Sequence, residues 1–431
     1  MRFKTQRPAS WQVCIQCGNE VVETDPHLRC TLCNGLLEVH HRPPAVTPAE
    51  LIQKFTERRG GGPGATASGV WRFREVVLPS AESVVSHPEG NTPLLHRAAL
   101  DHWVGLEHLL LKHEGHNPTG SFKDRGMTVG VTQAVRIGAR AVACASTGNT
   151  SASLAAYAAQ AGLPALVLVP SGSVAAGKLA QTLAYGARTL LVRGDFDQCL
   201  RMVHQASTEL GVYLLNSINP FRIEGQKTIV FEMLEQLSWE PPDWIVFPAG
   251  NLGNTAAFGK AICEAYEWKL IGRRPRLAAV QAEGAAPFVR SYEEGFARRH
   301  RVKAQTVATA IKIGDPASYD RAVSAIQETN GVVLAVSDQE LLEAKAAIDA
   351  SGVGCEPASA ASLAGLRQLI RRGIAKQSQR VVAIITGHIL KDPGLLLRFH
   401  QETDPPPPGA NRPIEIEPSL AELERVLRGR L

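Results

Sequence analysis

The chain has 431 residues and a formal net charge of +5, with 44% hydrophobic and 20% charged residues. These proportions are typical of a globular protein and exclude a disordered, collagen-like or disulfide-dense chain. No apolar run reaches the roughly 18 residues of a membrane span, and so modest a charge gives no reason to expect a nucleic-acid partner. The basic N-terminal residues lack the apolar stretch of an export signal, so we expect a cytoplasmic protein of two or three domains.

Four of the eight cysteines lie near the N-terminus in two C-x2-C pairs. Cys14, Cys17, Cys30 and Cys33 have the spacing of a zinc ribbon, in which two tight thiolate pairs supply four soft ligands. The alternative is four reduced thiols without a metal. We predict a structural Zn²⁺ site in a ribbon spanning residues 1–42, followed by a linker and lead-in over residues 43–87.

From about residue 105, short apolar runs alternate with helical patterns. Continuous apolar runs are typical of strands covered on both faces, and strands that alternate with helices indicate parallel α/β layers. The predicted strands are 109–112, 141–145, 165–169, 189–192, 212–215, 244–247, 277–280 and 381–385.

A run of prolines ends this regular pattern at residues 405–408. Beyond it, Ser419 and Glu422 have the spacing of a capping box ahead of several apolar residues, which predicts a short amphipathic helix. That helix either docks on the body or stays solvated without a partner.

One lysine, Lys123, stands where a helix is predicted to begin after a strand. The positive end of the helix dipole disfavours an ammonium there, and a lowered pKa makes the amine a better nucleophile. An exposed lysine without a role is the alternative.

Three loops follow predicted strands, at the edge where open parallel sheets bind ligands. In the loop over residues 146–150, hydroxyls and backbone N–H groups could hold a carboxylate. In the loop over residues 250–254, glycines would let N–H groups close around a phosphate at a helix N-terminus. The third loop places the hydroxyl of Thr386 at the end of the last strand. A bare turn is the alternative for the loop over residues 250–254.

Seven strings in this chain resemble the fold-type II pyridoxal-phosphate enzymes, and most closely the threonine synthases. In order, they are NPTGSFKDRG, ASTGNTSAS, NSINPFRIEGQKT, PAGNLGN, ATAIKIGDPAS, CEPASA and TGHILKDP. The resemblance implies two parallel-sheet α/β domains of the tryptophan synthase β type, with the cofactor in the cleft between them. The larger domain would comprise residues 88–111 and 216–400, and the smaller one residues 112–215. A proline-rich linker and the terminal helix would fill residues 401–431.

The resemblance also implies the residues of the site. Lys123 would bind pyridoxal 5'-phosphate as a Schiff base and then move protons between substrate carbons. The remaining cofactor contacts would come from Asn149, Gly250, Asn251, Leu252, Gly253, Asn254 and Thr386. The substrate would contact Ser146, Thr147, Thr150, Asn216, Ser217 and Arg222. The last three would hold a phosphate, because an arginine fork with neutral donors suits a phosphomonoester dianion.

The implied enzyme is a lyase that converts O-phospho-L-homoserine and water to L-threonine and phosphate, the last step of threonine biosynthesis. Related enzymes suggest a homodimer. Alternatives are a sister enzyme of the same fold, such as a cysteate synthase or a threonine or serine dehydratase, and a catalytically silent protein that binds partners through the ribbon. Two residues depart from the family pattern. Ile389 would narrow the space beside the cofactor, and Asp315 adds a negative charge.

Overall fold

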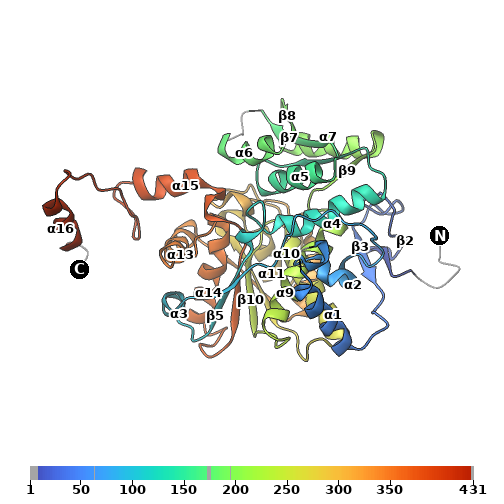
Figure 1. The fold of residues 1–431 in the computed structure, drawn as a ribbon, viewed down its shortest axis with the longest axis horizontal. Coiled ribbons are helices and arrows are strands. Elements are labelled where there is room, and N and C mark those ends of the chain that lie inside the picture. Colours follow the sequence, from blue (N-terminus) through green and yellow to red (C-terminus); the bar gives the residue numbers. More distant parts are fainter. Residues whose placement is uncertain (1–7, 63, 172–175, 195, 429–431) are drawn as a thin grey trace.

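The strands that the structure describes form three separate sheets. This computed structural model describes residues 8–62, 64–171, 176–194 and 196–428. No helix among those residues is long and apolar enough to span a membrane. Figure 1 shows the four-stranded sheet with its helices at the top and the six-stranded sheet below it. The predicted α/β class with parallel sheets is confirmed.

The larger sheet has five parallel strands and one antiparallel edge strand. In spatial order they are β12 (Val332–Val336), β11 (Arg276–Ala282), β10 (Trp244–Pro248), β13 (Val381–Ile385), β5 (Leu109–His113) and β4 (Leu94–His96). Alternate side chains of β10 enter two different cores, Ile245 and Phe247 on one face and Trp244 and Val246 on the other. Burial on both faces explains why these strands have continuous apolar sequences.

The smaller sheet is parallel throughout. Its strands, in spatial order, are β8 (Arg188–Val192), β7 (Ala165–Pro170), β6 (Ala141–Ala145) and β9 (Val212–Leu214). Its connecting helices are α5 (Asn149–Gln160), α6 (Ala176–Ala184) and α7 (Phe196–Glu209). All eight predicted strands are present, with ends that differ by at most two residues.

The N-terminal segment folds as a small antiparallel sheet in the order β2-β1-β3. Its strands are β1 (Ser10–Cys14), β2 (Glu20–Val22) and β3 (Leu37–His41). This sheet confirms the ribbon fold that the cysteine spacing predicts, and Figure 1 shows it at the side of the body.

The segment predicted as linker and lead-in is instead partly helical and buried. It contains α1 (Pro48–Gly60), which begins with a capping box of Thr47 and Glu50 and packs Leu51 and Phe55 into the main core. Trp71 and Phe73 follow it into the same core. Residue 63 of this predicted linker lies outside the described residues. The segment therefore stabilises the body, because each of these side chains buries apolar area.

The predicted C-terminal helix is present as α16 (Leu420–Arg428), and the Ser419 hydroxyl accepts a hydrogen bond from the Glu422 amide at 3.3 Å. None of the described side chains of this helix is buried, and Leu420 is 81% exposed. Figure 1 shows α16 on an arm that extends away from the body. The helix therefore does not dock on its own body, which contradicts the docked alternative.

Candidate active site

Loops that follow strands of both sheets surround one large cavity. Its volume is about 920 Å³, and it lies at the carboxyl ends of β6, β9, β10 and β13. All fourteen residues predicted to contact cofactor or substrate line it. They are Lys123, Ser146, Thr147, Asn149, Thr150, Asn216, Ser217, Arg222, Gly250, Asn251, Leu252, Gly253, Asn254 and Thr386.

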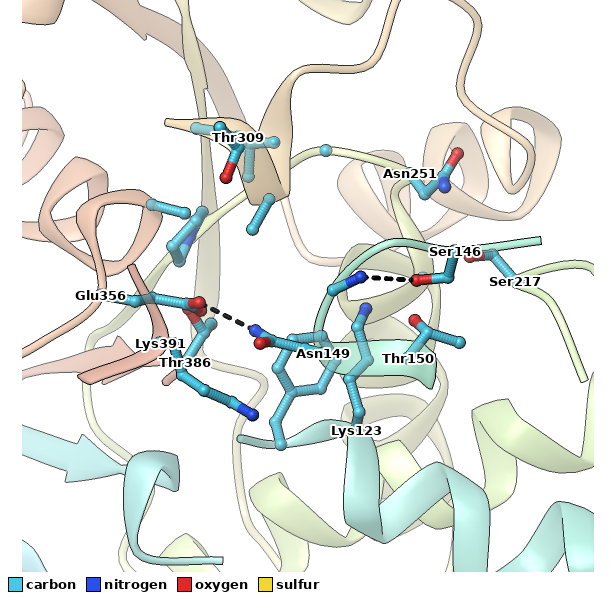
Figure 2. Close-up of a pocket in the computed structure, with 18 of the residues that line it drawn as sticks. Lys123, Ser146, Asn149, Thr150, Ser217, Asn251, Thr309, Glu356, Thr386 and Lys391 are labelled. Atoms are coloured by element: carbon cyan, nitrogen blue, oxygen red, sulfur yellow. Dashed lines mark hydrogen bonds between the residues drawn. The ribbon is translucent and has the colours of Figure 1, made fainter. Parts of the chain in front are cut away.

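Lys123 is the first residue of α4 (Lys123–Arg136), as the sequence predicts. Figure 2 shows its side chain entering the space that Asn149 and Thr150 also face. Burial, and then the charge of the Arg222 guanidinium, lower the pKa of Lys123 to about 7, while Glu356 acts in the opposite direction. The position of Lys123 at a helix N-terminus predicts such a shift from the helix dipole. In the structure, desolvation is the largest cause.

The loop after β10 has the geometry of a phosphate cradle. It leads into α10 (Gly253–Glu267), and Leu252 holds the left-handed conformation with φ 62°. Gly250 has no room for a side chain, because a Cβ there would lie 2.9 Å from the Cα of Ile311. The buried hydroxyl of Thr255 has no hydrogen-bond partner among the described residues. Backbone N–H groups and an open hydroxyl at a helix N-terminus suit an anion, so this loop fits the phosphate of pyridoxal phosphate.

Arg222 lies on the short helix α8 (Pro220–Gln226) and is 1% exposed. Its Nη1 donates to the carbonyl of Leu215 at 3.0 Å, whereas Nε and Nη2 have no partner in the described part of the chain. Burial lowers the pKa of Arg222 to about 10, so the group remains cationic at neutral pH. A buried guanidinium with two open donors is costly unless an anion pairs with it.

Asn216 and Ser217 follow β9 and line the same cavity as Arg222. The side chain of Asn216 exchanges two hydrogen bonds of 3.0 Å with the backbone of Ala145, one through Oδ1 and one through Nδ2. It therefore joins the ends of β6 and β9 and fixes the loop. Ser217 turns toward the cavity (Figure 2).

A carboxylate that the sequence analysis does not single out lies within the site. Glu356 accepts a hydrogen bond from the Asn149 amide at 2.8 Å (Figure 2), and it accepts a second from the Thr386 hydroxyl, also at 2.8 Å. Ser359 also contacts Thr386, with 2.8 Å between the two hydroxyl oxygens. Glu356 thus links two of the residues predicted to contact the cofactor, from separate loops. Its string, CEPASA, supports the family resemblance, but only the folded chain shows where the carboxylate points.

A hydrogen bond between two residues that the sequence does not single out lies at one edge of the cavity. Lys391, which follows β13, donates to Oε1 of Gln181 on α6 at 2.5 Å. Gln181 in turn donates to the carbonyl of Thr119 at 3.3 Å. Because β13 belongs to the larger sheet and α6 covers the smaller one, this contact joins the two halves across the cleft.

Of the two departures from the family pattern, Ile389 stands between His388 and Leu390, which line the cavity, and Asp315 lies on the surface. Ile389 packs beside Gly354, where a Cβ on that glycine would lie 3.2 Å from the Cβ of Ile389. Asp315 lies on the surface, paired with Arg299 at 2.5 Å and Arg301 at 3.0 Å. Neither residue is among the described residues that line the cavity, so Ile389 does not narrow the cofactor space as expected.

The four ribbon cysteines come together as metal ligands require. All four sulfur atoms lie within 4.8 Å of one another, with Cys14 to Cys33 at 3.4 Å and Cys17 to Cys30 at 3.6 Å. A tetrahedral zinc site with bonds of about 2.3 Å has sulfur–sulfur edges of about 3.8 Å. The amide of Leu32 donates to the sulfur of Cys30 at 3.4 Å, a contact that favours a thiolate. The ribbon therefore fits a zinc ion.

Comparison with known proteins agrees with this site. Residues 85–387 match the family described as pyridoxal-phosphate dependent enzyme. The threonine synthase of Methanocaldococcus jannaschii is 43% identical over 424 residues, which cover 97% of this chain and 99% of that protein. The threonine synthase of Methanosarcina acetivorans is 44% identical over 90% of this chain and 94% of its own length.

Among solved structures, maize serine racemase matches 83% of this chain and 98% of its own, with a TM-score of 0.62 and 21% identity, and so shares the fold. The chain therefore belongs to the pyridoxal-phosphate-dependent enzymes and, among them, to the threonine synthase family.

Proposed function

We propose that this chain converts O-phospho-L-homoserine and water to L-threonine and inorganic phosphate. The observation that carries the proposal is Arg222, a buried cation with two open donors that faces the same cavity as Lys123. Relatives named threonine synthase, similar over nearly the whole chain, support it. A dehydratase acting on unphosphorylated serine or threonine would have no phosphate to pair with this guanidinium, because the loop over residues 146–150 already serves the substrate carboxylate.

The cofactor roles follow from the positions of the residues. Pyridoxal phosphate, when bound, supplies the electron sink that stabilises negative charge on substrate carbons. Lys123 would hold it covalently, and Asn149 and Thr386 would contact its ring. Its phosphate would be enclosed by Gly250, Asn251, Leu252, Gly253 and Asn254.

The substrate roles divide between two loops. Arg222, Asn216 and Ser217 would hold the substrate phosphate until it leaves. Ser146, Thr147 and Thr150, at the start of α5, would hold the carboxylate. With a pKa of about 7, the Lys123 amine can accept and return protons near neutral pH. The contact between Lys391 and Gln181 would close the cavity edge and keep water out until it is needed as a reactant.

Zn²⁺ bound by Cys14, Cys17, Cys30 and Cys33 is part of the same proposal, and the distances between their sulfur atoms support it. A homodimer and a cytoplasmic location remain predictions. Light scattering of the purified protein tests the first, and fractionation of the source cells tests the second.

The deciding experiment compares phosphate release from O-phosphohomoserine and O-phosphoserine, with threonine quantified as product. We expect phosphohomoserine to be used with the higher kcat/KM and threonine to match the phosphate released. Preference for phosphoserine with sulfite would indicate a cysteate synthase, and a 2-oxo acid formed from threonine would indicate a dehydratase. Lys123→Ala is the control, because it should abolish turnover while the chain still folds.

A further inference from the structure

A buried hydrogen bond joins the ribbon to the helix that carries Arg222. Nε2 of His41, the last residue of β3, donates to Oε2 of Glu224 at 2.6 Å, and both side chains are fully buried. Glu224 lies two residues after Arg222 on α8. Two helical residues are about 200° apart around the axis, so Arg222 and Glu224 point to opposite sides of α8. Arg222 faces the cavity and Glu224 faces the ribbon.

The positive charge around Glu224 comes from two lysines, so the contact with His41 is a hydrogen bond and not part of a metal site. Glu224 also accepts from Lys227 at 2.5 Å and from Lys260 at 2.6 Å, and Lys260 donates in addition to the carbonyl of Val39 on β3. His41, Glu224 and Glu264 lie close enough to share a cation, but the two ammonium groups already supply the positive charge. Burial lowers the pKa of His41 to about 3, so the imidazole is neutral.

On its other side, α8 packs tightly against α4. A Cβ on Gly126 would lie 2.9 Å from the carbonyl oxygen of Arg222, and one on Gly130 would lie 3.4 Å from the Cγ of Arg222. The backbone of Arg222 is therefore in contact with the helix that begins at Lys123. The two helices touch at Gly126 and Gly130, where there is no room for α8 to come closer to α4. A shift of α8 therefore either carries α4 with it or moves α8 away from α4, toward the ribbon.

The ribbon also holds α4 directly. The carboxylate of Glu23 accepts from Arg136 at 2.5 Å, and its carbonyl accepts from the Gln133 side chain at 2.9 Å. The ribbon thus contacts both helices that carry the reactive groups, α4 with Lys123 and α8 with Arg222. The catalytic and substrate roles assigned above use none of these contacts.

We propose that His41 is a positioning residue for Arg222: its hydrogen bond to Glu224 fixes α8 so that the guanidinium stays in the cavity beside Lys123, and the ribbon thereby sets the affinity of the cleft for a phosphate group. That this phosphate belongs to the substrate rests on the proposed function. The hydrogen bond between His41 and Glu224 is observed independently of that function.

The test measures inorganic phosphate binding to the holoenzyme by calorimetry, together with KM and kcat. In the holoenzyme the cofactor fills its own phosphate cradle, so the titration reports on the Arg222 site. We expect His41→Ala to weaken phosphate binding about tenfold, which corresponds to about 1.4 kcal/mol, and to raise KM by a similar factor. Its kcat should stay within about twofold and its visible cofactor absorbance should be unchanged, because no cofactor contact is lost.

Two variants control for chemistry and position. His41→Gln keeps an amide donor at similar reach and should restore most of the phosphate affinity. His40→Ala removes the neighbouring, more exposed histidine of the same strand and should leave phosphate affinity at the wild-type value. If His41→Ala does not fold, His41→Asn replaces it, since its shorter amide keeps polarity without reaching Glu224.

Unchanged phosphate affinity in His41→Ala would overturn the proposal, as would equal losses of phosphate binding and cofactor retention, which indicate general structural support. If the wild-type enzyme does not use O-phosphohomoserine, the proposed function fails, yet the phosphate titration still decides whether His41 positions Arg222.

Discussion

Gly225 and Arg125 contact each other so closely that a side chain on Gly225 would overlap the carbonyl oxygen of Arg125. This contact brings α8 against the first turn of α4, and so places Arg222 beside Lys123. The electrostatic coupling between Arg222 and Lys123 therefore depends on the absence of a side chain at residue 225.

Gly225→Ala should therefore destabilise the protein and disturb the site. Overpacking of a buried contact typically costs about 1–3 kcal/mol, and separation of α4 from α8 would also raise KM. Denaturant unfolding and steady-state kinetics measure the two effects. Gly272→Ala is the matched control, because nothing lies within 4 Å of a Cβ at that position. Similar unfolding midpoints for the two variants would contradict the packing argument.

Arg222→Ala should weaken the use of a phosphorylated substrate far more than cofactor retention. Loss of this buried charge is expected to lower kcat/KM by the equivalent of about 2–5 kcal/mol, because Nε and Nη2 of Arg222 have no partner among the described residues and remain available to the phosphate. Arg222→Lys should recover only part of this loss, since an ammonium lacks the planar fork. Kinetics with phosphohomoserine and cofactor absorbance after dialysis provide the two readouts. Equal loss of both would show that Arg222 supports the structure instead.

Replacing one zinc ligand should release the metal and lower stability. The ribbon has only a small apolar cluster of its own, which consists of Leu37 and two of the proposed ligands, Cys14 and Cys30, so the metal is expected to provide much of its folding energy. Cys14→Ser should therefore lose zinc, measured by elemental analysis, and unfold at a lower temperature. Cys263→Ser, a change to a half-buried cysteine on α10, should keep the metal. Full zinc content in Cys14→Ser would exclude this ligand set.

Much of the body could be predicted because its strands and the loops after them carry patterns that can be recognised in short stretches of sequence. The buried strands of parallel sheets are apolar throughout, and the loops after them meet at one edge, so residues as distant as Lys123, Gly250 and Thr386 could be assigned to one site. The edge strand β4 is only three residues long and carries little signal. Strand β12 carries the apolar run VVLAV, which is typical of a buried strand, although the predicted strands do not include it.

Other features depend on contacts that a sequence does not display. The bonds from Glu356 to Asn149 and Thr386 join separate loops of the fold. The helix over Pro48–Gly60 did carry a local signal, since Thr47 and Glu50 form a capping box and Leu51 and Phe55 are four residues apart. The flanking prolines and glycines favour a linker, but burial of Leu51 and Phe55 in the main core stabilises the helix.

The lowered pKa of Lys123 predicts how the apoprotein recombines with pyridoxal phosphate. Only the neutral amine attacks an aldehyde, so the rate should rise with pH through an inflection near the pKa of about 7 and then level off. A lysine with its ordinary pKa would show a rate that still rises above about pH 9. Visible absorbance after mixing, recorded between about pH 5.5 and 9.5, gives the profile.

Two variants should move this inflection in opposite directions. Arg222→Ala removes a positive charge that disfavours the ammonium, so the pKa of Lys123 should rise and the inflection should shift to higher pH. Glu356→Gln removes a negative charge that favours the ammonium, so the inflection should shift to lower pH. Lys391→Met is the control for a cation at the cavity edge, since it is not among the groups that shift Lys123. If both Arg222→Ala and Glu356→Gln moved the inflection in the same direction, charge would not be its cause, and burial alone would have to account for the reactivity of this amine.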